Sequence, residues 1–490
     1  MKTKRFTKVV FALAGSLLTI GSMQAQQTQH QRDSLLGLQR NAISLISPGE
    51  GKAAGASGFW GYAFGDYAYM ATGDSAGRGT KQQYKGVGAS TASGGVAQNT
   101  HPNAFEIRRA YLGYDYNINK HFSAYALLAY EGDQDVNDDR TVYLKYMYVK
   151  WKNIWKNTDL KIGQQATNSF ANAYNTEPLL GYRSVEKTIM DMHGVDGSSD
   201  MGLTLEGRLW TAHAKDTNNV PLFIGYSAMI GDNSGNNPVA GFTGTAGAAS
   251  LGGATITSTS TSVSTGTVTT TTTTKTTIAV NPFNETTDNA KKIRANVYVN
   301  ALNTALTVGF YTDYINYGNT YYGTTKGYQH SVMTDKVYAA YNSKWFGIGF
   351  EWFTQSYTNG EFETWKKGTG VNDTVNATQT GMSIFAHGTI IPGTLNIFAR
   401  YDMYTPDNNY SYNANETFTE LFSNVSSSGN GNSYKETFMN FGLDWTPTKD
   451  KKIHIMPNVW YYGIKNGYGS DNLASDNYMF YRISFLFGFN

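Results

Sequence analysis

From Phe59 onwards, apolar and polar residues alternate along a series of short segments. In residues 345–357, for example, Phe346, Phe350 and Trp352 share one parity, whereas Gly349 and Glu351 share the other. Successive side chains of a β-strand point to opposite faces, so this pattern predicts strands with one apolar and one polar face. Sixteen such strands are expected, at residues 59–71, 105–117, 121–131, 140–151, 159–165, 201–210, 221–231, 292–301, 306–317, 331–341, 345–357, 382–391, 394–404, 435–446, 452–464 and 477–489.

The connections between these strands alternate in length. Short ones lie at 117–120, 152–158, 302–304, 342–344, 392–393 and 447–451, and long ones at 72–104, 132–139, 166–200, 232–290, 318–330, 358–381, 406–434 and 465–476. The connection at 211–220 takes the place of a short one but is longer than the other turns. Outer-membrane barrels have an even number of antiparallel strands, short periplasmic turns and long outer loops. The sequence therefore predicts an all-β fold, a transmembrane antiparallel β-barrel of about 16 strands, over residues 57–490.

The first 25 residues have the pattern of a cleaved secretory signal peptide. Lys2, Lys4, Arg5 and Lys8 precede a short apolar run over 9–20, and the small residue Ala25 stands at the expected cleavage site. Residues 26–56 form a polar periplasmic leader, with a short helix expected over 33–46. Export to the outer membrane of a Gram-negative cell is the location that this organisation predicts.

Composition agrees with an exported barrel. The chain has no Cys but 35 Tyr, 25 Phe, 9 Trp and 52 Gly, and its mean hydropathy is −0.41. A barrel strand presents every second residue to lipid, which keeps the mean hydropathy low. Without the four basic residues of the signal, the 39 Lys and Arg fall to 35 against 37 Asp and Glu. This balance gives no reason to expect a nucleic-acid partner.

The connection over 166–200 breaks the alternation and carries Pro178, Gly181 and many charged residues. We expect this segment to fold into the lumen and to narrow it. Its candidate pore-constriction residues are Arg183, Glu186, Lys187, Asp191, His193 and Asp196.

Parity also assigns charged residues to the lumen wall. A Lys or Arg on the lipid face at mid-bilayer costs roughly 2–4 kcal/mol, so charged strand residues are expected to point inward. The candidates are Arg109, Lys145, Lys161, Glu206, Arg208, Arg294, Asp313, Glu351, Arg400, Asp402 and Arg482. The alternative is that these residues form ion pairs that brace the wall and have no part in selectivity.

Four segments in order along the chain, FEIRRAYLGYDY at 105–116, LKIGQQ at 160–165, YRSVE at 182–186 and MGLTLEG at 201–207, resemble the phosphate-selective porin family of the O and P type. The resemblance implies a 16-stranded porin, commonly trimeric, whose third outer loop folds inward. The family tends to have a Lys and a Pro soon after the Gly at 163, where this chain has Gln164, Gln165, Ala166 and Thr167. An anion-selective pore needs clustered Arg and Lys at its narrowest point. The third loop has more acidic than basic residues, so the resemblance supports the fold and not phosphate selectivity.

Residues 232–289 are a low-complexity, Thr- and Gly-rich stretch, which is expected to be an outer loop. The acidic run 133–138 resembles the start of a calcium loop but lacks its Gly and its final Glu, so a solvated acidic loop is favoured. The sequence predicts no enzyme activity and no catalytic residues. It also predicts no cofactor and no metal site.

Three functions remain open from the sequence. The first is a porin for passive diffusion of small hydrophilic solutes or ions, the second a surface adhesin or structural barrel anchor, and the third a substrate-specific anion or saccharide channel. The expected partners are outer-membrane lipid and lipopolysaccharide, small hydrophilic solutes and two further copies of the chain in a homotrimer.

Overall fold

A computed structural model of the chain describes residues 55–74, 79–81, 102–132, 142–171, 185–211, 222–232, 255–264, 267–276, 290–302, 305–321, 327–343, 345–365, 373–408, 416–420, 434–466 and 476–489. The expected signal peptide, the leader with its helix and the acidic run 133–138 lie outside these residues. Among the described helices, none has the length and apolar character to cross a membrane.

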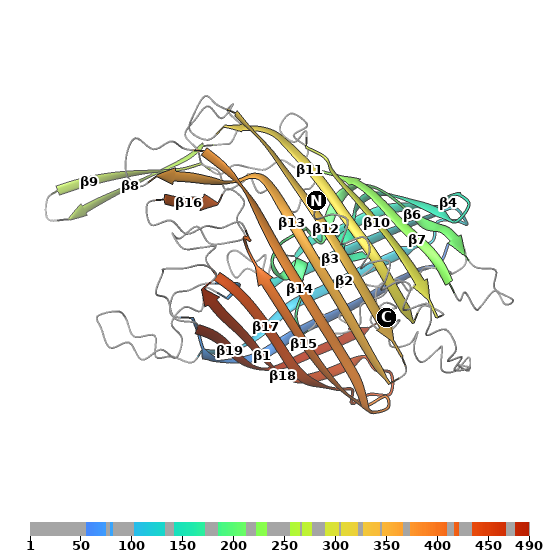
Figure 1. Ribbon diagram of the computed structural model, residues 1–490. Coiled ribbons are helices and arrows are strands. Elements are labelled where there is room, and N and C mark those ends of the chain that lie inside the picture. Colours follow the sequence, from blue (N-terminus) through green and yellow to red (C-terminus); the bar gives the residue numbers. More distant parts are fainter. Residues whose placement is uncertain are drawn as a thin grey trace.

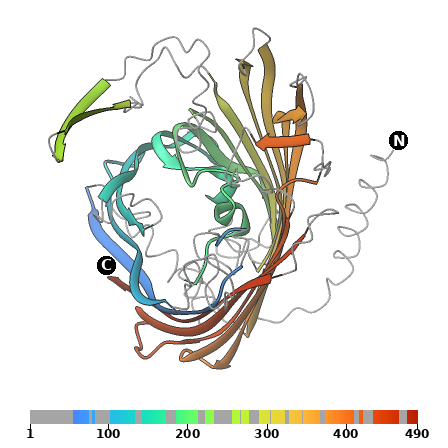
Figure 2. The same ribbon diagram turned by 90° about the vertical axis from the view of Figure 1, so that its left-hand side faces the viewer.

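Sixteen strands form one closed antiparallel ring (Figures 1 and 2). The ring runs from β1 to β7, continues through β10 to β15 and β17 to β19, and closes where β19 pairs with β1. The prediction of a 16-stranded barrel is thus confirmed. The strands are β1 Ser57–Thr72, β2 Asn103–Tyr116, β3 Phe122–Glu131, β4 Val142–Trp155, β5 Thr158–Ala166, β6 Ser199–Thr211, β7 Leu222–Gly231, β10 Lys292–Ala301, β11 Leu306–Tyr321, β12 Gly327–Asn342, β13 Phe346–Trp365, β14 Asp373–Ile391, β15 Leu395–Thr405, β17 Tyr434–Trp445, β18 Ile453–Asn466 and β19 Asp476–Phe489.

The structure adds elements that the alternation did not predict. β13 and β14 extend well beyond the expected ends at 357 and 382, and the short strand β16 (Glu416–Glu420) pairs with the extension of β13. A hairpin of β8 (Thr255–Ser264) and β9 (Thr267–Thr276) lies within the stretch expected to be a low-complexity loop. Threonine is β-branched and favours extended backbone, so a Thr-rich stretch can pair as strands even though its composition is of low complexity.

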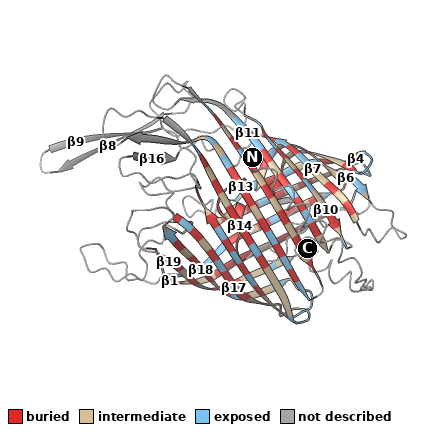
Figure 3. Ribbon diagram, viewed as in Figure 1, coloured by how far each residue is buried: buried red, intermediate tan, exposed pale blue. Residues whose placement is uncertain are grey.

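Burial alternates along the strands of the ring (Figure 3). On β10, Ile293 and Val297 are exposed on the outer wall, whereas Lys292, Arg294 and Asn296 are buried on the inner one. The same holds on β13, where Phe346, Ile348 and Phe350 are exposed. An apolar outer wall around a polar interior is the arrangement of a barrel that spans a membrane.

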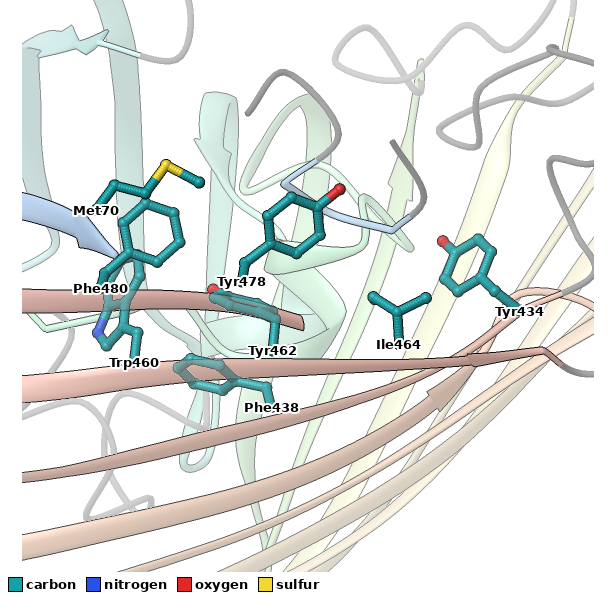
Figure 4. Close-up of a cluster of buried hydrophobic side chains, with 8 residues drawn as sticks. All are labelled: Met70, Tyr434, Phe438, Trp460, Tyr462, Ile464, Tyr478 and Phe480. Carbon is teal, nitrogen blue, oxygen red and sulfur yellow. The ribbon is translucent and has the colours of Figure 1, made fainter. Parts of the chain in front are cut away.

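The inner wall also holds aromatic side chains, which a simple polar-inward pattern does not predict. One cluster, drawn in Figure 4, joins β1, β17, β18 and β19 and consists of Met70, Tyr434, Phe438, Trp460, Tyr462, Ile464, Tyr478 and Phe480. A second joins β1 to β4 and consists of Trp60, Phe64, Tyr111, Tyr125, Leu127, Ala129 and Tyr146. The charged residues of the lumen therefore lie among aromatic rings.

Candidate functional site

The connection between β5 and β6 is described over 167–171 and 185–198, and it contains two short helices, α3 (Asn168–Ala171) and α5 (Ile189–Met192). α5 begins after Thr188, whose side chain accepts a hydrogen bond from the backbone N–H of Asp191 at 3.4 Å. Such a side chain satisfies one of the free N–H groups at a helix start. Ile189 and Met190 are fully buried in a cluster with Val195, Tyr311, Phe353 and Tyr404. Arg183 lies outside the described residues.

Glu186 is held by Arg108 of β2. The Arg108 guanidinium donates to the Glu186 carboxylate at 3.0 Å and to the Val185 carbonyl at 2.8 Å. Tyr462 of β18 donates to the other carboxylate oxygen at 3.3 Å. Burial alone would raise the pKa of Glu186, but the positive charges of Arg108 and Lys81 outweigh burial and hold the pKa well below its usual range. Glu186 is therefore a buried, ionised anchor.

Asp196 is the centre of a second buried ionic cluster. Lys292 Nζ donates to it at 2.9 Å, and the Arg294 guanidinium donates to both of its carboxylate oxygens at 3.0 Å. Arg294 also donates to Asp200 at 2.7 Å. Burial would raise the pKa of Asp196, but Arg294 and Lys292 together lower it well below the ordinary value. These bonds join the connection to β10, because both cations lie on that strand.

His193 joins the connection to the inner wall at β15 and β17. Its ring stacks on Tyr404 of β15, and its Nε2 is 3.7 Å from a carboxylate oxygen of Glu436 on β17. Burial lowers the pKa of His193 to about 3, and the nearby Arg400 acts in the same direction. His193 is consequently neutral at pH 7.

Lys187 and Asp191 have partly exposed side chains, whereas those of Glu186, His193 and Asp196 are buried. The Lys187 carbonyl accepts a hydrogen bond from Arg400, which fixes the backbone at this point. The Asp191 carboxylate lies 3.9 Å from the Arg109 guanidinium and keeps 17% of its side chain exposed. Of the described residues expected to form the constriction, these two are the ones that solution can reach.

The structure brings most of the expected lumen-wall residues together with partners of opposite charge. Arg109 and Lys145 both approach Glu131 of β3, Lys161 lies 2.6 Å from Glu206, and Lys336 lies 2.6 Å from Glu351. The remaining pairs are Arg400 with Asp402, Lys292 with Asp313, and Arg482 with Asp66. Arg208 differs, since it is exposed and lies over the ring of Phe223 at 4.4 Å. This geometry favours the bracing alternative for the buried pairs.

Several charged residues of the lumen wall are not among those predicted from the sequence. Asp66, Glu131 and Lys336 have the parity of the other inward residues of their own strands, so a full parity count would have identified them. Arg108 could not be identified in this way. A bulge in β2, where the register with β1 shifts between Phe64 and Gly65, allows both Arg108 and Arg109 to be buried.

Within the described ranges, His, Asp and Glu side chains form no group of three that could hold a metal ion. The chemistry that this arrangement offers is ionic. It combines fixed, paired charges in a low-dielectric wall with a few charges open to solution.

Comparison with known proteins gives fold-level likeness only. No protein-family model matches the chain, and neither does any curated protein. An OmpT of Vibrio cholerae has 12% identity and a TM-score of 0.44, covering 89% of this chain and 99% of its own. An anion-selective porin from Comamonas acidovorans has 10% identity and a TM-score of 0.47, covering 89% and 99%. The channel DcaP of Acinetobacter baumannii has 10% identity and a TM-score of 0.47, covering 89% and 98%. At such values the likeness says nothing about what this site does.

Proposed function

We propose that this protein is an outer-membrane porin through which small hydrophilic solutes and ions diffuse passively. In this proposal the segment 185–200 lies in the lumen of the barrel and narrows it. The outer wall faces lipid, and the charged inner wall faces the permeating solution. The proposal concerns a general diffusion channel and includes no selectivity for phosphate, because the described charges of the segment are mixed in sign.

The observation that carries the proposal is the set of strands that the segment contacts. Glu186 bonds to Arg108 of β2, and Asp196, ten residues later, bonds to Arg294 of β10. In the ring, β2 and β10 are separated by β3 to β7 one way round and by the rest of the ring the other way. A segment of this length that reaches both inner walls is best explained by a path across the interior. The view of Figure 2, with the green segment around α5 inside the ring, supports this path.

The geometry further suggests a division of tasks. Glu186, His193 and Asp196 are buried and would hold the segment in place, which sets the width of the opening. Lys187 and Asp191 are partly exposed and would act on passing ions. Charges that line the narrow part of a pore determine which ions pass, whereas charges that are paired and buried have little effect beyond it.

The test is conductance of the purified, folded protein in a planar lipid bilayer. In symmetric KCl, insertion of single proteins should give discrete, ohmic current steps. Folding is checked by heat-modifiable migration in gel electrophoresis. A folded barrel that inserts without current steps would contradict the proposal.

The adhesin alternative is distinguished by deleting residues 246–277, which include the β8–β9 hairpin. Conductance should persist in this variant if the barrel is a channel, whereas an adhesin should lose surface binding. Assembly as a homotrimer, contact with lipopolysaccharide and cleavage after residue 25 stay predictions.

A further inference from the structure

A short piece of another connection lies against the same part of the wall. Residues 79–81 belong to the connection between β1 and β2, which the sequence predicts to be an outer loop. Thr80 donates two hydrogen bonds to Glu436 of β17, one from its backbone N–H at 2.7 Å and one from its hydroxyl at 2.6 Å. Glu436 is 2% exposed, so Thr80 is fixed at a buried carboxylate of the inner wall.

The backbone at Gly79 fits this position because glycine has no Cβ. Its φ is +78°, in the left-handed region that other residues rarely adopt. A Cβ at this site would lie 2.4 Å from the Glu436 carboxylate and 2.7 Å from Ile464. The close approach of residues 79–81 to the wall therefore depends on this glycine.

This contact places Lys81 beside the anchored segment. Its Nζ lies 3.8 Å from Glu186, 5.0 Å from the ring centroid of Trp460 and 5.5 Å from that of Tyr462. Both rings belong to the aromatic cluster of Figure 4. A cation over an aromatic face is attracted to it, which holds the ammonium group at this position.

Among the charged side chains around Trp460, Lys81 is the most exposed. Around Trp460, the cations Lys81, Arg108 and Arg482 lie beside the carboxylates of Asp66 and Glu186. The side chain of Lys81 is 18% exposed, whereas those of Arg108 and Arg482 are 9% and 6% exposed. Asp66 and Glu186 are also almost fully buried. Lys81 also faces the buried carboxylate of Glu436, so three carboxylates balance the three cations, and Lys81 is the most exposed of these six charges.

We propose that Lys81 is a selectivity-determining residue, which favours the passage of small anions over cations at the constriction. The inference rests on the proposed channel function and assigns part of the constriction to the first long connection. Lys81 acts directly on permeating ions, because its side chain is 18% exposed, whereas the charged side chains around it are almost fully buried.

The absence of cysteine from the natural chain allows a direct test. In Lys81→Cys, the single thiol can be modified during the recording, first with a thiosulfonate reagent that carries a quaternary ammonium and, in a separate channel, with one that carries a sulfonate. The measured quantity is the ratio of chloride to potassium permeability, taken from the reversal potential in a KCl gradient. The same folded barrel is compared before and after modification, so a difference in folding cannot explain the change.

The cationic reagent should raise the permeability ratio about two- to five-fold, as expected for one unit charge near an aqueous path. The sulfonate reagent should lower it. Lys156→Cys, in the exposed turn between β4 and β5, is the matched control and should show no change. The inference would be overturned if modification of Lys81→Cys left the ratio of chloride to potassium permeability unchanged. It would also be overturned if the reagents did not modify the thiol.

Gly79→Ala tests the positioning of Lys81 while keeping its charge. The added Cβ meets Glu436 and Ile464, and a φ of +78° disfavours alanine, so the backbone of residues 79–81 should shift and the permeability ratio should change even though no charge is removed. A ratio equal to that of the natural chain would contradict the assigned position. Absence of current steps from the natural chain itself would instead contradict the channel function.

Discussion

The imidazole of His193 stacks on the phenol ring of Tyr404, with the ring centroids 3.5 Å apart and the planes inclined by 11°. The contact joins the segment between β5 and β6 to β15, which four strands of the ring separate from β10, the strand that binds Asp196. Arg400, Glu186, Lys81 and Glu436 also surround this imidazole. The stacking therefore belongs to a compact group that contains both cations and anions.

Acid should loosen this contact. The pKa of His193 is about 3 in the folded protein against an ordinary value of 6.5. Between these values, an unfolded or released segment takes up a proton that the folded form does not. The stability that the neutral His193 gives to the folded form is complete above pH 6.5 and declines as the pH falls towards 3. At pH 5, about 2 kcal/mol of this stability is lost.

Heat-modifiability midpoints and open-channel current noise, recorded between pH 7 and pH 5, measure this effect. His193→Gln should reduce the fall in stability between pH 7 and pH 5 by the share of His193, about 2 kcal/mol. The control His121→Gln, in the exposed turn before β3, should retain it. Equal pH profiles for the natural chain and His193→Gln would show that His193 is not the group that titrates.

Removing the charge of Asp196 should widen the pore. Asp196→Asn leaves Lys292 and Arg294 buried with less negative charge nearby, and breaking one partner of such a cluster costs roughly 3–5 kcal/mol. The connection should separate from β10, which raises single-channel conductance and lowers the heat-modifiability midpoint. Asp450→Asn, an exposed turn residue between β17 and β18, should change neither quantity. An unchanged conductance in Asp196→Asn would mean that the cluster does not set the aperture.

Neutralising the two exposed charges of the segment should shift ion selectivity in opposite directions. Lys187→Gln removes a positive charge and should lower the ratio of chloride to potassium permeability, whereas Asp191→Asn should raise it. We expect about two-fold changes, since both side chains are in contact with solution. Reversal potentials in a KCl gradient give the ratio, with Lys156→Gln as the control. Shifts of the same sign for both variants would exclude a direct action of these charges on ions.

A charge on the outer wall should destabilise the barrel. Val297 is exposed in the middle of β10, so Val297→Lys places an ammonium group against lipid at a cost of roughly 2–4 kcal/mol. Leu302→Lys makes a comparable change in the turn at the end of the same strand and should cost little. Reversible unfolding of both variants in lipid vesicles measures the difference. Equal unfolding free energies would argue against a membrane-facing wall at Val297.

The ring of strands was predictable because parity and connection length are local properties of the sequence. Each predicted strand corresponds to one strand of the ring. The strand extensions and the β8–β9 hairpin were missed because they lie in regions without apolar alternation, where backbone pairing alone defines the strand. The bulge that allows both Arg108 and Arg109 to be buried has no signal in the alternation either.

The site was less predictable, because its contacts join distant parts of the chain. Parity identified Arg294 and Arg400 as inward residues, but it could not show which carboxylates neutralise them. The contact of Thr80 with Glu436 joins residues 356 positions apart, and no local pattern indicates it. Whether a charge is an anchor or remains open to ions thus follows from burial and not from sequence.

The unequal strands also give the barrel an uneven rim. β13 has 20 residues and β3 has 10, which at about 3.3 Å per residue is a difference of about 33 Å along the strand. Figure 1 shows β11 to β14 extending past their neighbours on the side of the long connections. The ends of the strands therefore form an oblique rim at this mouth of the barrel. A particle moving along the strand direction meets the edge of the wall earlier at β13 than at β3, so the strands give this mouth a direction as well as a width.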